Sequence, residues 1–116
     1  KSHIELLPEN NERATGLEGY SHVIVVFYLD LAEEAPNKPS MMNIEGTEMG
    51  IFATRSQLRP NHLGVSAVRL LSVDERGLWV RGLDAIDGTL VLDVKPYLPD
   101  YDAYPDAHGP DGDAGA

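Results

Sequence analysis

Hydrophobic positions along this chain come in short runs of strand length, separated by turn-forming residues. The longest run is "VIVVFYL", whose β-branched composition predicts a buried strand over about residues 21–29. Further apolar or alternating runs predict strands over residues 3–7, 49–54, 65–73, 78–83 and 89–94. The turn signals "DERG" (residues 74–77) and Asp87-Gly88 separate the last three strands and predict hairpins.

Signals for helices are few. Residues 9–14 are polar and compatible with one or two helical turns ended by Gly16. Residues 30–46 contain two prolines and no periodicity, which predicts a long loop. The fold class predicted is mainly β, either a small β-barrel or a strongly curved mixed sheet with one or two short helices. We expect a single β domain over residues 1–102 and an acidic, disordered tail over residues 103–116.

Composition narrows the class of protein. A chain of 116 residues with 42% hydrophobic residues has room for one core. No apolar run approaches the roughly 20 residues of a membrane helix, and no secretion leader opens the sequence. The absence of cysteine excludes disulfides and zinc-thiolate sites, and no histidines stand at metal-ligand spacing. We therefore expect a cytoplasmic protein without a membrane or metal partner.

The charge is unevenly distributed along the chain. The formal net charge is −10, with −6 on residues 1–50, +1 on residues 51–95 and −5 on residues 96–116. A strongly acidic protein usually repels nucleic acid, because the phosphates carry the same sign. The middle third is locally basic, so a nucleic-acid partner is disfavoured by the total charge but stays open.

The basic middle third contains "ATRSQLRPNHLGVSAVRL" (residues 53–70), in which Arg55 and Arg59 flank a bend at Pro60-Asn61. Arginine side chains carry forked donors that suit carboxylate or phosphate groups, so this corner could face one anion, and His62 lies in the same corner. The alternative is an ordinary loop whose arginines pair with some of the 19 acids of the chain. The sequence lacks the glycines of a phosphate loop here.

A second candidate is "LDAIDGTLVLDVKPY" (residues 83–97). Asp84, Asp87 and Asp93 could supply a carboxylate for ribose hydroxyls or an amine, and Thr89 could offer its hydroxyl. The alternative is purely structural, because Asp-Gly is a common hairpin turn and Asp93 alternates with valines as an outward strand residue does.

Three segments together resemble one known family. "GLEGYSHVIVVFYL", "GIFATRSQLRPNHLGVSAVRL" and "LDAIDGTLVLDVKPYLPDYD" are similar to the TrmO/YaeB (UPF0066-like) family of S-adenosylmethionine-dependent tRNA methyltransferases. Its members typically carry "GVFATRSPFRPNPIGLS" and "LDGTPVLDIKPY". The resemblance covers roughly residues 3–102. It implies a β-barrel-like fold, S-adenosylmethionine as cofactor, homodimers, and methyl transfer to the exocyclic amine of threonylcarbamoyladenosine in tRNA.

The resemblance also implies roles for individual residues. It assigns cofactor binding to Asp30, Leu31, Arg55, Val65, Asp87, Gly88, Thr89 and Leu90. It assigns substrate binding to Arg59, Asn61 and His62, and it names no catalytic base. These assignments require the bend at Pro60 and the hairpin at Gly88 to fold against one another and enclose a shared hollow.

The sequence departs from the family pattern at several points. The match starts near Ile4, so we expect this chain to lack the segment, with its "PRQ" cofactor contact, that members usually carry before it. The usual "FWFH" is "FYLD" here, with Asp30 in place of the histidine, while "PNPIG" is "PNHLG" and "DGTP" is "DGTL". Two alternatives therefore stay open: an S-adenosylmethionine- or nucleotide-binding barrel with altered or no activity, and a structural or interaction module.

Overall fold

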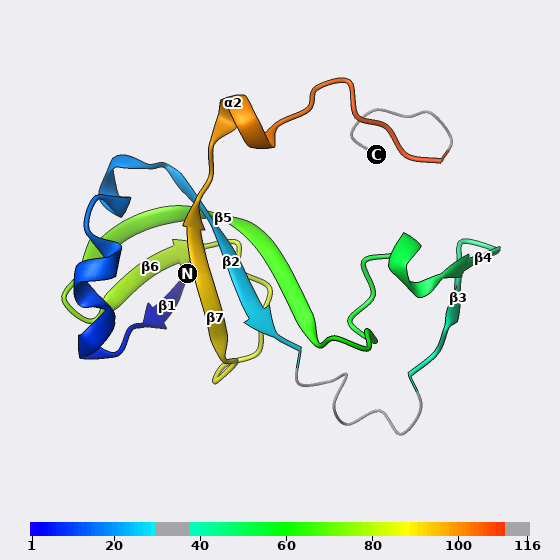
Figure 1. Cartoon of the computed structure of the whole chain (residues 1–116), viewed down its shortest axis with the longest axis horizontal. Helices are drawn as coiled ribbons and strands as arrows, with labels where there is room; N and C mark the ends of the chain where they lie inside the picture. Colours follow the sequence, from blue (N-terminus) through cyan, green and yellow to red (C-terminus); the bar gives the residue numbers. More distant parts are fainter. Residues whose placement is uncertain (30–37, 111–116) are drawn as a thin grey trace.

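A five-stranded sheet forms the body of the protein, and its strands follow the order β1-β6-β5-β2-β7. The computed structural model describes residues 1–29 and 38–110. The strands of this sheet are β1 (Ser2–Glu5), β2 (His22–Tyr28), β5 (Leu63–Asp74), β6 (Gly77–Arg81) and β7 (Val91–Pro96). Neighbouring strands are antiparallel. Figure 1 shows how strongly the sheet curves, which confirms the predicted mainly β fold class.

The core lies on the concave face of this sheet. Burial alternates along β2, so that Val23 and Val25 are fully buried while the residues between them are partly exposed. Leu78 and Val80 of β6 are also fully buried. Each such side chain contributes on the order of 1.5–3 kcal/mol by leaving water. The strict alternation on β2 explains why its register is well determined, since a shift by one residue would expose this face.

The predicted "DERG" hairpin joins β5 to β6, with Asp74 paired to Gly77. The Asp74 carboxylate accepts hydrogen bonds from the amides of Arg76 and Gly77, at 2.8 and 2.9 Å. Gly77 has φ +145°, and a Cβ there would lie 1.9 Å from the carbonyl oxygen of Ile4. Only glycine therefore allows β1 to pair with the start of β6.

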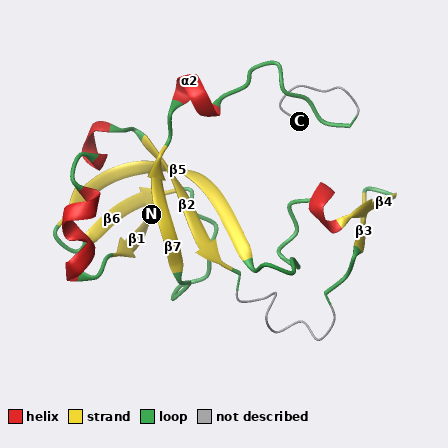
Figure 2. Cartoon of the chain, in the orientation of Figure 1, coloured by secondary structure: helices red, strands yellow, loops and turns green. Residues whose placement is uncertain are grey.

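Short helices cover one end of the sheet (Figure 2). Residues Pro8–Ala14 form the 3₁₀ helix η1, and Leu17–Gly19 form a second one, η2. The predicted helical turns over residues 9–14 are confirmed, and Gly16 breaks them with φ +94°. A single turn of α-helix, α2 (Pro99–Asp102), follows β7. The described tail continues to residue 110, and its disorder stays a prediction.

A second, two-stranded sheet lies apart from the main one (Figure 1). It pairs β3 (Met41–Ile44) with β4 (Thr47–Gly50), and the 3₁₀ helix η3 (Ile51–Ala53) follows. Two sequence predictions were wrong here, because the loop predicted over residues 30–46 contains β3 and the strand predicted over residues 49–54 ends at Gly50. The turn forms because Glu45 and Gly46 both adopt positive φ, a conformation typical of tight hairpins.

Candidate functional site

Hydroxyl groups hold the loop that carries the two candidate arginines. The buried Thr54 donates its hydroxyl to the carbonyl oxygen of Ile51 at 2.9 Å and accepts the amide of Ser56 at 3.2 Å. The Ser56 hydroxyl in turn accepts the amide of Leu58 at 3.1 Å. Such side-chain bonds replace the regular backbone ladder in turns. The "ATRS" sequence thus fixes the loop backbone.

The two arginines of this loop have different partners. Arg59 Nη1 donates to the carbonyl oxygens of Thr54 and Ser56, at 2.8 and 3.3 Å. Arg55 Nη2 makes one longer bond, 3.3 Å, to the carbonyl oxygen of Val65 on β5. Within the described parts of the chain, neither guanidinium is in an ion pair with a carboxylate. The charge of Arg55, which is exposed, is therefore available to a ligand.

The arginine loop forms one wall of a hollow of about 530 Å³. Phe27 and Leu29 form its apolar base, and both are mostly buried. Gly64 lies against them, since a Cβ there would come within 2.9 Å of both side chains. The remaining lining residues are Arg55, Ser56, Gln57, Arg59, Leu63, Val65, Ser66 and Asp84.

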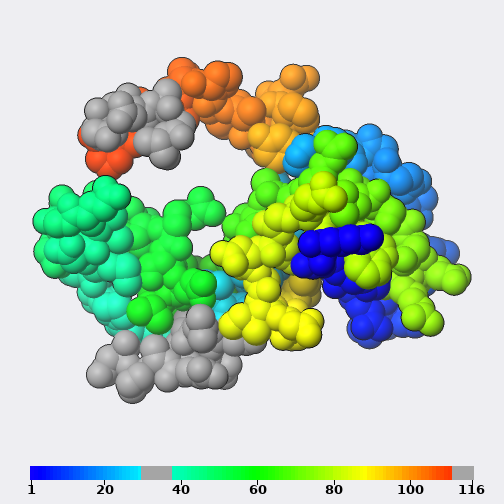
Figure 3. Space-filling view, turned by 180° about the vertical axis from the view of Figure 1, so that it is seen from behind, coloured from blue at the N-terminus to red at the C-terminus, as the bar shows by residue number. Residues whose placement is uncertain are grey.

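A smaller hollow of about 150 Å³ adjoins the first. Its own lining comes from Tyr28 and from the residues around the Asp87-Gly88 turn, including Ile86 and Thr89. Both hollows are lined by Phe27, Leu29, Gln57 and Asp84. In Figure 3 the yellow segment around residues 84–89 lies beside the green arginine loop, with a recess between them. The arginine loop and the residues around Asp87-Gly88 thus line adjoining hollows, but Pro60 and Gly88 themselves line neither. A single hollow shared by the two segments stays a prediction.

The end of β2 connects the two loops. The amide of Tyr28 donates to the carbonyl oxygen of Leu90 at 2.9 Å, and the amide of Leu29 donates to that of His62 at 2.8 Å. The successive amides at the end of β2 and just beyond it therefore bind two different loops: Tyr28 binds the connection from β6 to β7, and Leu29 binds the arginine loop. The Thr89 amide bonds to the carbonyl oxygen of Ile86, which closes the turn at Asp87-Gly88. The hairpin predicted at this turn was wrong, because β6 and β7 are not neighbours in the sheet and the turn lies in the connection that crosses from one to the other.

Several predicted site residues lie outside both hollows. Asn61 accepts the amide of Leu63 through its side chain, at 3.4 Å, and so serves the bend itself. Asp87, Gly88 and the exposed Leu90 belong to the connection from β6 to β7 but line neither hollow. Asp30 and Leu31 lie outside the described residues. The binding roles of all these residues stay predictions.

His62 is also absent from the lining of both hollows. Its ring stacks on Tyr28 with a centroid separation of 5.2 Å and an interplanar angle of 13°. Its Nε2 lies 2.8 Å from Lys38 Nζ, and because an ammonium group can only donate, Nε2 is the acceptor of this contact. His62 has φ +57°, which a proline could not adopt.

Some lining residues were not predicted as site residues. Gln57 and Tyr28 stand in the signature segments but were assigned no role, and Asp84 was considered as a carboxylate without a role. Gly64, in contrast, belongs to the signature and was expected to shape the pocket. The pairing of Phe27 with Gly64 explains the glycine, because it leaves room for the aromatic ring at the base of the hollow. A glycine followed by alternating residues signals such a close approach, but only the fold shows which residue packs against it.

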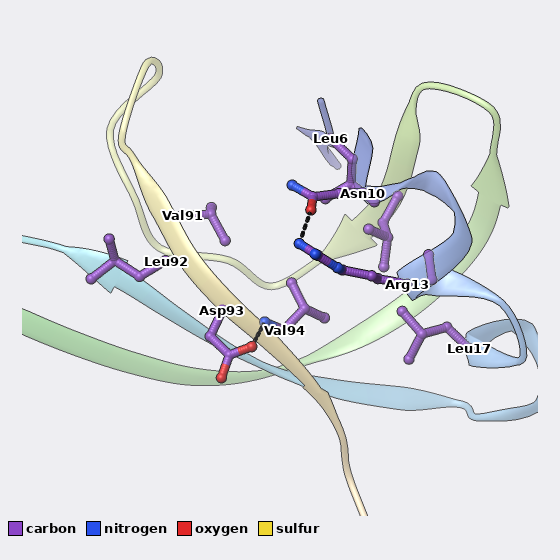
Figure 4. Close-up of a pocket in the computed structure, with 10 residues that line it drawn as sticks. Leu6, Asn10, Arg13, Leu17, Val91, Leu92, Asp93 and Val94 are labelled. Carbon is purple, nitrogen blue, oxygen red and sulfur yellow. Dashed lines mark hydrogen bonds between the residues drawn. The ribbon is translucent and has the colours of Figure 1, made fainter. Parts of the chain in front are cut away.

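A separate cavity of about 290 Å³ lies between η1 and β7 (Figure 4). Arg13 donates to the side chain of Asn10 at 2.6 Å, and the Asp93 carboxylate accepts the amide of Val94. Asp93, which the sequence offered as a candidate carboxylate, lines this cavity, but none of the residues that the family resemblance assigns to cofactor or substrate binding does. The candidate site is therefore the pair of adjoining hollows.

The described residues form neither a candidate metal site nor a membrane-spanning helix. Within residues 1–29 and 38–110, no group of histidine and acidic side chains is placed to hold a metal ion. The same residues contain no helix long and apolar enough to cross a bilayer.

Comparison with known proteins places the chain in a family. A family model described as the tRNA-methyltransferase O N-terminal domain matches residues 1–103. The putative S-adenosylmethionine-dependent methyltransferase RcsF of Pseudomonas aeruginosa is 43% identical over 96% of this chain and 48% of its own length. A probable S-adenosyl-L-methionine-binding protein of Methanothermobacter thermautotrophicus is 41% identical over 89% of this chain and 74% of its own. The tRNA (adenine(37)-N6)-methyltransferase of Mus musculus is 41% identical over 76% of this chain and 21% of its own.

Solved structures agree with the sequence comparison. A crystal structure of TrmO from Pseudomonas aeruginosa has a TM-score of 0.76 and 40% identity, covering 93% of this chain and 46% of that one. The chain thus spans about half the length of the Pseudomonas relatives. Because the family model covers nearly all of its residues, the chain belongs to the tRNA-methyltransferase O N-terminal domain family.

Proposed function

We propose that this domain binds S-adenosylmethionine in the two adjoining hollows and takes part in methyl transfer to tRNA. One observation carries the proposal: residues of all three signature segments line these hollows, which share four lining residues. The names of the relatives support it, since they include S-adenosylmethionine-dependent methyltransferases and tRNA (adenine(37)-N6)-methyltransferases.

The residues of the hollows fit the chemistry of the cofactor. A volume of about 530 Å³ lies within the usual range of small-molecule sites, about 300–1,000 Å³. Arg55 offers a forked donor to the carboxylate of the methionyl part, while Phe27 and Tyr28 offer apolar and aromatic surface to the adenosyl part. When bound, the cofactor supplies a methyl group attached to a cationic sulfur.

The contribution of the chain's own residues is mainly positioning. Direct transfer needs the donor and the accepting amine aligned, and holding two reactants in line provides a large share of the rate. The hydroxyl-fixed arginine loop and the hydrogen-bonded turn at Asp87-Gly88 are suited to this task, because their backbones are set by hydrogen bonds before a ligand arrives. No described side chain is assigned as a base.

The proposed acceptor is the exocyclic amine of threonylcarbamoyladenosine in tRNA. The threonyl carboxylate and the tRNA phosphates are anions, and the basic segment around the arginine loop is the part of this acidic chain suited to meet them. In this proposal Arg59, Asn61 and His62 form the side of the site that faces the substrate, while Asp30, Leu31, Val65, Asp87, Gly88, Thr89 and Leu90 contribute to cofactor binding.

We further propose that the working unit is a homodimer in the cytoplasm. Leu63 and Val65, at the rim of the larger hollow, expose 42% and 49% of their surface, and a second copy could cover them. Residues 1–102 would act as the domain, with residues 103–116 as a disordered tail.

Two measurements test the proposed function. Calorimetric titration of the chain with S-adenosylmethionine and S-adenosylhomocysteine should show binding of both. Incubation with labelled cofactor and tRNA from cells that lack the methyl group should place the label on threonylcarbamoyladenosine, detected by mass spectrometry of nucleosides. An absence of binding heat with both ligands would contradict the cofactor site.

A second candidate is a domain that binds the cofactor without transferring its methyl group. The names of the archaeal relatives favour it, since they are described only as probable S-adenosyl-L-methionine-binding proteins. The net charge of −10 also opposes a tight grip on tRNA. Binding heat without methyl incorporation into tRNA would support this candidate.

A further inference from the structure

The charged side chains are distributed unequally between the linings of the two adjoining hollows. The larger one has Arg55 and Arg59 in its wall, whereas the smaller one has no arginine or lysine in its lining. Asp84 lines both hollows and is the only acid in either lining over the described residues. No described lysine or arginine forms an ion pair with it. The exposed Asp84 therefore lines the same hollow as Arg55 and Arg59 without forming an ion pair with either.

The positions of these charged residues set the direction in which an extended ligand would lie across the two hollows. A ligand bound by both Arg55 and Thr89 has to extend from the larger hollow into the smaller one, because each residue lines only one of them. The carboxylate of such a ligand belongs near the arginines, and its aromatic part near Tyr28 and Ile86. The middle of the ligand then passes the wall that the hollows share, where Asp84 and Gln57 lie.

We propose that Asp84 faces the cationic sulfur of S-adenosylmethionine and acts as its counter-ion. This inference rests on the proposed function and adds a ligand-contacting residue to it. The sulfur joins the methionyl and adenosyl parts, so it occupies the middle of the molecule. A carboxylate there attracts the positive sulfur and gains nothing from the neutral sulfur of S-adenosylhomocysteine. Asp84 thus gives the site a preference for the charged methyl donor over the spent product.

The test compares the affinities of the two ligands in charge variants of the chain. Asp84→Asn keeps the shape of the side chain and removes its charge; Asp84→Glu keeps the charge. We expect Asp84→Asn to weaken S-adenosylmethionine binding about fivefold at low salt and S-adenosylhomocysteine binding less than about twofold. Asp84→Glu should keep more of the preference for S-adenosylmethionine over S-adenosylhomocysteine than Asp84→Asn does. Glu75→Gln removes the same charge from the exposed β5–β6 hairpin and should leave both affinities unchanged.

The possible results separate this inference from the proposed function. A selective loss of S-adenosylmethionine affinity in Asp84→Asn supports it, and raising the salt should shrink that loss by screening. An equal loss for both ligands would overturn it, because Asp84 would then face a group that they share. Unchanged affinities would overturn it as well. Failure of the wild-type chain to bind either ligand would instead overturn the proposed function, and this inference with it.

Discussion

Arg59 binds the carbonyl oxygen of Thr54 through its Nη1 atom at 2.8 Å, across the loop that walls the larger hollow. The same atom lies 3.3 Å from the carbonyl oxygen of Ser56. An arginine that the sequence suggested for substrate binding is thus also a brace for the backbone next to Arg55. Its removal should therefore affect the hollow before any substrate is present.

The first prediction concerns this brace. Arg59→Ala should weaken S-adenosylmethionine binding about tenfold, because it removes charge-assisted hydrogen bonds that hold the loop. Calorimetry measures the affinity, and amide hydrogen exchange should show faster exchange at Ser56 and Leu58. Arg81→Ala, at the exposed end of β6, is the matched control and should change neither. An unaltered affinity together with faster exchange would show that the loop does not contribute to binding.

Substitution of Arg55 should not discriminate between the two ligands, unlike the loss of the Asp84 charge. Arg55→Ala should weaken S-adenosylmethionine and S-adenosylhomocysteine by similar factors, about tenfold, because both ligands carry the carboxylate that the guanidinium would bind. Arg55→Lys keeps the charge but loses the fork, so an intermediate effect is expected. The measurement is parallel titration of both ligands. A loss confined to one ligand would contradict the placement of the carboxylate at this end.

Gly64 controls the base of the larger hollow. A Cβ at this position would lie 2.7 Å from the ring of Phe27 and 2.9 Å from Leu29. Gly64→Ala should therefore destabilise the fold by about 1–3 kcal/mol and reduce cofactor affinity, because the ring has to move into the hollow. Thermal unfolding and calorimetry measure the two effects. Gly50→Ala is the matched control, since a Cβ there meets nothing within 4 Å and its φ of −60° suits alanine.

The fourth prediction concerns stability in acid. The hydrogen bond from Lys95 lowers the pKa of Asp93 below its ordinary value of 3.8, and the amide of Val94 adds to this effect. A lowered pKa in the folded state means that the unfolded state binds more protons. The stabilisation is therefore complete above the ordinary pKa and is lost as the pH falls through the lower, folded value.

Asp93→Asn should consequently lose less stability than the wild type between about pH 6 and pH 2.5. The difference should be small, because both partners of the ion pair are about half exposed. Denaturant unfolding at a series of pH values measures it. Asp106→Asn, an exposed acid beyond α2, should follow the wild-type curve. Identical curves for all three proteins would contradict the prediction.

Local sequence signals predicted most of the main sheet. The β-branched run in β2 and the turn at residues 74–77 carry their own conformational preference, so the strand and the β5–β6 hairpin followed from neighbouring residues alone. The turn at residues 87–88 also formed, but β7 pairs with β2 rather than with β6, which no local signal could show. The β3–β4 hairpin escaped prediction because most of its strand residues are exposed, Met41 and Ile44 among them, and a hydrophobic alternation is absent. Its turn depends on Glu45, a residue that rarely adopts positive φ.

The sequence alone determined the strand pattern, the uneven charge and the three family segments, because each depends on residues that are neighbours along the chain. Only the tertiary structure decided which side chains share the hollows. Tyr28 binds Leu90 and Leu29 binds His62 through successive backbone amides, and these bonds bring the arginine loop and the connection from β6 to β7 together. That encounter depends on strand register and on the curvature of the sheet. It therefore placed Gln57 and Asp84 in the lining of both hollows and left His62 out of it.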